Sequence, residues 1–327
     1  MNDKKVSLVL SGGGARGMAH LGVIRELWRR GYSIHAVAGC SIGAIVGAML
    51  AMGKLEEFIA FMETDDGDAI FKQLDFTFST NGFIKGQKLI ERFQCFAPDC
   101  NMEDLPVKLV IVASDLRTGE QVVFRSGSVY RAMRASVAIP AVITAVEDSG
   151  HWLVDGGIIN PLPLDCVARI AGDLLIAVNL YAAPLIPEAG TPISIVSGGV
   201  HDDPTFWEQI KEGWQNMTGW KENLMESLFE SNNGKYDFFS TLRIMSEISS
   251  KRLAEQSLLL YPVDILVEIP IASCGIFSFG KIKELIRLGE QKAESALVRW
   301  QLNKQKDKQR SLLLNQIAKF WPFFKKK

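Results

Sequence analysis

The chain has 327 residues, of which 47% are hydrophobic and 22% are charged, and its formal net charge is −1. Such a chain can bury a large core, so we expect one large domain or a domain with an appendage, and the near-neutral charge argues against a nucleic-acid-binding protein. The longest apolar run, residues 44–52, is about half of the ~20 residues that a membrane-spanning helix needs, so we expect no such helix.

The first predicted strand, Val6–Leu10, leads into the loop S-G-G-G-A-R-G at residues 11–17, and a helix is predicted from about Ala15 to Arg30. Backbone N–H groups between a strand end and a helix start suit an anion. The loop also fits G-x-G-x-x-G, but a dinucleotide site needs an acidic residue at the end of the second strand. That strand ends in Gly39-Cys40-Ser41, so an oxyanion hole is favoured.

The second predicted strand runs into Gly39-Cys40-Ser41-Ile42-Gly43, and a helix-forming run follows it. A G-x-S-x-G sequence between a strand and a helix is typical of a nucleophile elbow. We expect a strained backbone at Ser41 and close contact between residues 39 and 43, for which two glycines leave room. The helix that starts after Ser41 directs backbone N–H groups at the reaction centre. The pattern therefore predicts Ser41 as a nucleophile.

Predicted elements continue in alternation after the elbow. They are helices at about 54–63, 86–96 and 128–138, a loop at 65–80, and a hairpin at 107–124. A short strand then ends at Asp155-Gly156-Gly157, a helix is predicted from about Leu164, and another strand spans Leu174–Leu180. This alternation predicts an α/β fold with a largely parallel central sheet.

A serine nucleophile needs a base, and histidine is the usual one. The chain has four histidines: His20, His35, His151 and His201. We expect the first two to be structural and His201 to be solvated in a linker. His151 lies four residues before Asp155, or more than ~10 Å back along the strand. Asp155 is therefore the predicted base, its basicity raised by burial.

The second half of the chain is less regular. Gly, Pro and Ser loosen residues 184–204, aromatic residues with helical spacing mark 205–230, and a helix, a strand and a helix are predicted at 238–259, 264–269 and 281–300. We therefore expect a domain of residues 1–300 with a helical insertion at about 186–262. The Trp-rich stretch 205–230 suits core packing, a lid or a membrane-docking face.

Residues 301–327 form a basic tail, in which eight Lys and Arg residues stand against one acidic residue. Aromatic residues beside a terminal lysine block resemble an amphipathic interfacial anchor that attracts anionic lipid. Packing of this tail on the body, with a solvated basic end, is an equally good interpretation.

Five cysteines without C-x-x-C spacing predict neither a disulfide framework nor a metal site. The apolar run at residues 6–10 is too short for a signal peptide. We therefore expect reduced thiols and a cytoplasmic protein, bound peripherally at the inner face of a membrane if the tail is an anchor.

Three blocks of the sequence resemble the patatin-like phospholipase family. They are Gly12-Gly13-Gly14-Ala15-Arg16-Gly17, Gly39-Cys40-Ser41-Ile42-Gly43 and Asp155-Gly156-Gly157. Residues 135–140 and the Asn-x-x-Pro at 160–163 look like further blocks of that family. The resemblance covers roughly residues 5–182 and 264–298. It implies a three-layer α/β/α fold, in which the amides of Gly12, Gly13 and Gly14 form the oxyanion hole and Arg16 braces their loop.

The resemblance further implies hydrolysis of lipid acyl esters on a Ser41–Asp155 dyad, and we expect the reaction to pass through an acyl-enzyme. We expect no metal, because the sequence holds no cluster of metal ligands, and no cofactor. Expected substrates are phospholipids, lysophospholipids or other acyl esters. An acyltransferase or thioesterase with the same dyad, and a membrane-associated regulatory protein with a vestigial site, stay open. The sequence leaves the head group, chain length and oligomeric state undetermined.

Overall fold

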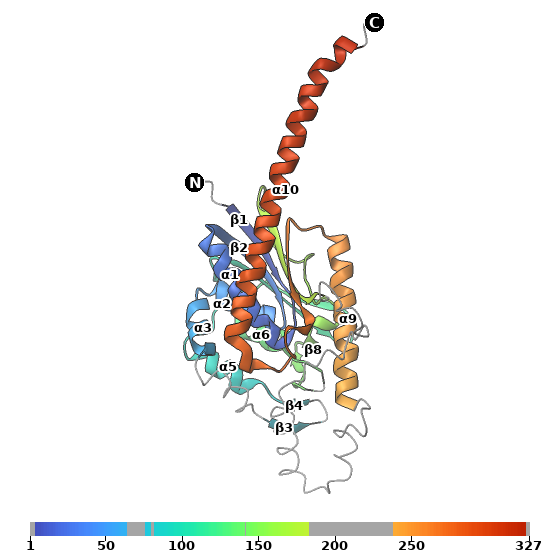
Figure 1. Ribbon diagram of the computed structural model, residues 1–327. Coiled ribbons are helices and arrows are strands. Elements are labelled where there is room, and N and C mark those ends of the chain that lie inside the picture. The colour runs from blue at the N-terminus through green and yellow to red at the C-terminus, as the bar shows by residue number, and fades with distance from the viewer. Residues whose placement is uncertain (1–3, 64–75, 80–81, 141, 183–237, 325–327) are drawn as a thin grey trace.

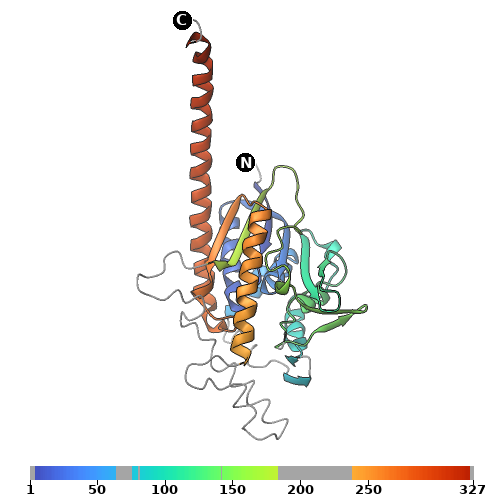
Figure 2. The same cartoon turned by 90° about the vertical axis from the view of Figure 1, so that its right-hand side faces the viewer.

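A mixed sheet of eight strands has several helices on one face and, among the described residues, one long helix on the other (Figures 1 and 2). The computed structural model describes residues 4–63, 76–79, 82–140, 142–182 and 238–324. From edge to edge the strands are β10 (Ile265–Pro270), β9 (Leu174–Ala182), β1 (Lys4–Leu10), β2 (Tyr32–Cys40), β5 (Lys108–Asp115), β8 (His151–Asp155) and β7 (Val146–Asp148), with β6 (Gln121–Phe124) paired to β5. Strands β10 to β5 are parallel, whereas β6, β7 and β8 are antiparallel to their partners.

Within the described residues, the α-helices are α1 (Met18–Arg29), α2 (Ile42–Ala51), α3 (Leu55–Glu63), α5 (Gln87–Gln94), α6 (Val129–Ser136), α9 (Phe238–Leu260) and α10 (Ile282–Phe324). A separate small hairpin joins β3 (Phe76–Ser79) to β4 (Gly82–Ile84). The expected α/β fold with a largely parallel core is therefore confirmed.

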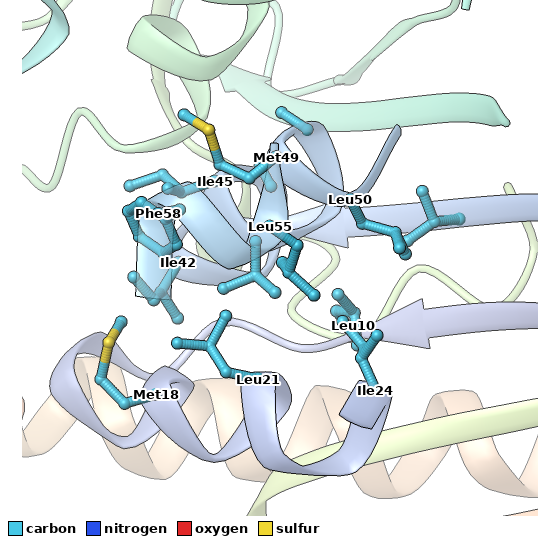
Figure 3. Close-up of a cluster of buried hydrophobic side chains, with 14 of the residues drawn as sticks. Leu10, Met18, Leu21, Ile24, Ile42, Ile45, Met49, Leu50, Leu55 and Phe58 are labelled. Atoms are coloured by element: carbon cyan, nitrogen blue, oxygen red, sulfur yellow. The ribbon is translucent and has the colours of Figure 1, made fainter. Parts of the chain in front are cut away.

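Alternating residues of the strands build two cores, one on each face of the sheet. Leu8 and Leu10 of β1 face the core that α1, α2 and α10 cover, and Figure 3 shows Leu10 gathered with side chains of α1 and α2. Val9 faces the opposite core, which includes Ala254 of α9. A strand that is buried on both faces reads as a continuous apolar run, which is why β1 was recognisable in the sequence.

Helices α1 and α10 touch through their backbones. A Cβ on Gly22 would lie 1.9 Å from the carbonyl oxygen of Ile286, and a Cβ on Gly289 would lie 2.0 Å from that of Ala19. No larger residue fits at either position, so this crossing fixes the direction of α10 relative to the sheet.

The outer half of α10 projects from the body of the protein (Figures 1 and 2). The helix continues without a break from Ile282 to Phe324, across the boundary expected at residue 300. Among the α10 residues whose burial the structure describes, the last buried one is Leu297, whereas Leu302 and Leu312 are exposed. Among the described helices, none is both long and apolar enough to cross a membrane.

Most expected elements are present, and two expectations were wrong. No helix starts near Leu164; the chain there forms turns, and Leu162, Leu164, Cys166 and Val167 are buried in the core on that face of the sheet. Residues 76–79, expected in a loop, form strand β3. The Trp-rich stretch 205–230 lies outside the described residues.

Candidate active site

Ser41 lies at a sharp bend between β2 and α2, as the sequence predicted. Its backbone has φ 55° and ψ −124°, a conformation that costs a residue with a Cβ about 1–3 kcal/mol and persists only where the surroundings enforce it. The N–H of Ser41 donates to Ser136 Oγ at 2.8 Å, and its carbonyl oxygen accepts from the N–H of Ala44 at 2.8 Å. The bend is therefore held from both sides.

The glycines around the bend occupy positions where neighbouring atoms leave no room for a side chain. A Cβ on Gly39 would lie 2.3 Å from the carbonyl oxygen of Gly43, and a Cβ on Gly43 would lie 2.3 Å from that of Leu10. A Cβ on Gly17 would lie 2.3 Å from the Ile42 side chain. The crowding expected between residues 39 and 43 is thus present, and Gly17 permits the contact between the glycine-rich loop and α2.

Asp155 reaches Ser41 from the antiparallel strand β8. Cys40 pairs with Val112 of β5, and the next residue of β5, Ala113, pairs with Asp155, so Ser41 and Asp155 stand at the same level of the sheet. Ser41 Oγ donates a hydrogen bond of 2.5 Å to Asp155 Oδ2. The two side chains that the sequence singled out are therefore in direct contact.

The Asp-Gly-Gly turn fits closely around this contact. Asp155 Oδ1 accepts from the N–H of Gly157 at 2.8 Å, which orients the carboxylate. A Cβ on Gly156 would lie 2.5 Å from the carbonyl oxygen of Val112, so only glycine lets the turn lie against β5. Burial raises the pKa of Asp155 to about 6, against the hydrogen bonds from Ser41 and Gly157 that lower it. The carboxylate is thus a stronger base than an exposed aspartate and is still largely ionised at neutral pH.

The glycine-rich loop faces the bend, and its three first glycines differ in role. The N–H of Gly12 donates to the carbonyl oxygen of Pro161 at 3.0 Å, which corrects the expectation that this amide serves an oxyanion. Gly12 instead provides space, since a Cβ there would lie 3.3 Å from Ser41 Cβ. Gly13 and Gly14, with φ of 150° and 59°, line the pocket beside Ser41, and neither of their amides donates to a described residue.

Arg16 ties this loop to two later segments. Its guanidinium is buried, and Nη1 donates to the carbonyl oxygen of Ile271 at 3.0 Å. Nη2 lies 2.9 Å from Oε1 of Glu247 on α9. These contacts connect the glycine-rich loop to the segment that follows β10 and to α9.

The three described histidines have other partners. His20 is buried against the carbonyl oxygen of Ser11 at 2.9 Å, and burial lowers its pKa to about 4. His35 contacts Asp173 at 2.9 Å, and His151 contacts Asp115 at 2.8 Å. None of them is hydrogen-bonded to Ser41, and His201 lies outside the described residues. Among the described side chains, Asp155 is the one placed to take the serine proton.

A pocket of about 420 Å³ opens above the contact between Ser41 and Asp155. Its apolar walls include Ile139, Ile158, Met245 and Phe277, which suits an acyl chain. Tyr181 also lines it, and burial raises the pKa of its hydroxyl, so that group stays neutral. Among the described residues, no three His, Cys, Asp or Glu side chains gather as a metal site requires.

Sequence reasoning missed that residues 136–138 hold the backbones of Ser41 and Asp155. Ser136 Oγ accepts from Ser41 N–H, and the carbonyl oxygen of Ala138 accepts from Asp155 N–H at 2.9 Å. A signal was present, because this stretch was one of the blocks that resembled the family. Helix α9, which supplies Met245 and Glu247 to the pocket, gave only an amphipathic pattern.

Replacing Ser136 by alanine should lower kcat roughly 10- to 100-fold at similar KM, since a small displacement of the nucleophile has effects of that size. It leaves the buried N–H of Ser41 without its acceptor, at a cost of about 1–3 kcal/mol in the free energy of unfolding. Steady-state kinetics and urea denaturation measure both. Ser114→Ala is the matched control, because Ser114 is also buried and its Oγ has no hydrogen-bond partner among the described residues. A wild-type kcat in Ser136→Ala contradicts the positioning role.

The structure thus brings together, in an α/β fold, a serine at a strand-to-helix bend, a carboxylate in contact with it and a glycine-rich loop after the adjacent strand. The sequence model of the patatin-like phospholipase family matches residues 8–167, which include all three features. The chain belongs to the patatin-like phospholipase family.

Relatives of the chain extend over most of its length. An uncharacterized NTE family protein of Mycobacterium tuberculosis is 31% identical over 337 residues, which cover 92% of this chain and 94% of the relative. Patatin-like phospholipase domain-containing protein 6 of Homo sapiens is 24% identical over 306 residues, covering 92% of this chain and 21% of that protein. Among solved structures, VipD from Legionella pneumophila aligns with a TM-score of 0.46 at 14% identity, covering 91% of this chain and 67% of VipD.

Proposed function

We propose that the protein is a serine lipid acyl hydrolase that cleaves fatty acyl esters through an acyl-enzyme on Ser41. The observation that carries the proposal is the 2.5 Å hydrogen bond from Ser41 Oγ to Asp155 Oδ2 at the floor of a largely apolar pocket. Membership of the patatin-like phospholipase family supports a hydrolase that acts on lipids.

In the first half of the reaction, Asp155 accepts the hydroxyl proton as Ser41 Oγ attacks the ester carbonyl carbon. The negative oxygen of the tetrahedral intermediate accepts hydrogen bonds from the amides of Gly13 and Gly14. The intermediate collapses, the ester C–O bond breaks, and protonated Asp155 gives its proton to the departing alcohol. The acyl group is then covalently bound to Ser41.

In the second half, Asp155 takes a proton from a water molecule, whose oxygen attacks the acyl carbon. Collapse of this intermediate returns the proton to Ser41 Oγ and releases the fatty acid. An acyltransferase would differ only in that an alcohol replaces the water, and a thioesterase only in its leaving group. The proposal takes phospholipids, lysophospholipids or related acyl esters as substrates.

Two measurements test this function together. A fluorophosphonate probe should label Ser41, located by peptide mass mapping, and incubation with a mixed lipid extract should release free fatty acid. Mass spectrometry of the extract then identifies which lipids lose an acyl chain. Labelling without release of fatty acid from any ester contradicts the hydrolase.

We also propose a cytoplasmic protein that binds peripherally to anionic membrane through its tail. Residues 301–327 hold eight Lys and Arg residues and, near the end, an aromatic cluster, and the described residues 302–312 of α10 are exposed. Apolar contact and lysine charge together provide the two signals that stable peripheral binding needs.

Truncation after residue 300 should abolish flotation with vesicles that contain anionic lipid, because it removes the basic part of α10 and retains the buried residues up to Leu297. Flotation of the full chain should weaken with added salt as surface charge is screened. Thermal denaturation of the truncated protein checks that it still folds. Equal flotation of both forms contradicts the anchor.

A further inference from the structure

A carboxylate from α9 reaches the buried cation of the glycine-rich loop. Oε1 of Glu247 lies 2.9 Å from Nη2 of Arg16, and the two side chains are 19% and 2% exposed. Both residues line the pocket that contains Ser41. The ion pair is thus part of the wall that a substrate meets, and Glu247 comes from outside the stretch that matches the family model.

Helix α9 is held in this position by hydrogen bonds one and three turns further along. Ser250 Oγ donates to the carbonyl oxygen of Gly157 at 3.0 Å, and Ser257 Oγ donates to that of Leu162 at 2.9 Å. Residues three and four apart share a helix face, so the Ser250 contact holds Glu247 toward the pocket. Among the α9 cations whose side chains the structure describes, Lys251 and Arg252 pair with Glu255 and do not line the pocket.

The charged side chains among the described pocket residues carry no net positive charge. They are the guanidinium of Arg16 and the carboxylates of Asp155 and Glu247. A buried guanidinium alone is a good receptor for a phosphate or carboxylate. Neither Nε nor Nη2 of Arg16 has a hydrogen-bond partner among the described residues, and Nη2 is within ion-pair distance of Glu247. With Glu247 in place that cation is already paired, and an anionic group would also meet a second carboxylate.

We infer that Glu247 is a specificity-determining residue that selects acyl esters without a net negative charge near the ester. The inference rests on the proposed function, since it concerns substrates of that same pocket. Specificity here arises from repulsion of the wrong ligand, in addition to attraction of the right one. Removing the carboxylate should open the site to anionic amphiphiles and leave uncharged ones unaffected.

Two amphiphiles that the enzyme cannot hydrolyse test this selection by binding alone. They are dodecyl phosphate and 1-O-dodecylglycerol, an uncharged ether, each titrated calorimetrically below its micelle concentration. Wild-type protein should bind the ether at least tenfold more tightly than the phosphate. Glu247→Gln should bind dodecyl phosphate at least tenfold more tightly than wild type and the ether within twofold of it. Glu255→Gln, an exposed control on the same helix, should change neither.

Equal or tighter binding of the phosphate by wild type contradicts the inference, and this comparison needs no variant to fold. The inference is also contradicted if Glu247→Gln changes the affinity for both amphiphiles by the same factor, or changes neither affinity. Glu247→Asp, which keeps the charge, should keep the wild-type preference.

Turnover of lysophosphatidic acid and monoacylglycerol with the same acyl chain separates this inference from the proposed function. If the binding pattern holds and neither ester is hydrolysed, the hydrolase is contradicted and the charge selection stands. If both esters are hydrolysed and Glu247→Gln leaves the ratio of their kcat/KM values unchanged, the charge selection is contradicted and the hydrolase stands.

Discussion

Ser41→Ala is expected to lower the kcat of ester hydrolysis by roughly 10⁴-fold or more, because no nucleophile remains to form the acyl-enzyme. The protein should still fold, since alanine keeps the Cβ and backbone contacts of the bend and loses one side-chain hydrogen bond to Asp155. Hydrolysis of a p-nitrophenyl acyl ester and thermal denaturation measure the two properties.

A matched control for this variant is Ser149→Ala. Ser149 is the other described non-glycine residue with positive φ, at 51°, and it lies exposed in the turn before β8. It should keep wild-type activity, so that any loss in Ser41→Ala is due to the missing hydroxyl and not to alanine in this backbone conformation. Retained turnover in Ser41→Ala would contradict the assignment of Ser41 as the nucleophile.

Asp155→Asn is expected to lower kcat by roughly 10³-fold or more, because an amide has the shape of the carboxylate and cannot accept the serine proton. In the wild-type enzyme, kcat/KM should fall as the pH decreases through about 6, where Asp155 becomes protonated, and should level off above it. The residual activity of Asp155→Asn should lack this acidic limb.

The same substitution is expected to lower activity without lowering thermal stability. Burial raises the pKa of Asp155 in the folded protein, so the ionised carboxylate is destabilising as the pH rises from its unfolded pKa to its folded one. Asp155→Asn removes that charge and should melt at pH 7 no lower than wild type. Wild-type activity with an unchanged pH profile in Asp155→Asn would exclude Asp155 as the base.

Local features of the site were predictable from the sequence because neighbouring residues determine them. Gly39 and Gly43 flank a bend whose crowding follows from chain geometry, and the serine between them is positioned by the strand and helix on either side. Contact between Ser41 and Asp155, 114 residues apart, depends on strand pairing, so the sequence indicated it only through the resemblance and by eliminating the histidines.

Features that depend on tertiary packing were beyond the sequence. The amide of Gly12 is engaged by the carbonyl oxygen of Pro161, and no local pattern identifies such an acceptor. The stretch around Leu164 follows the apolar surface of the sheet instead of its helical propensity. Glu247 reads as an ordinary helix surface residue until α9 is placed over the pocket.

The contact between α1 and α10 at Gly22 and Gly289 packs the backbones of the two helices directly against each other. The turn that carries Gly14 leads directly into α1, and the N–H of Ala15 donates to the carbonyl oxygen of Ile276, just ahead of α10, at 2.8 Å. The crossing and this hydrogen bond therefore connect the helix that projects from the body to the loop whose glycines line the pocket beside Ser41.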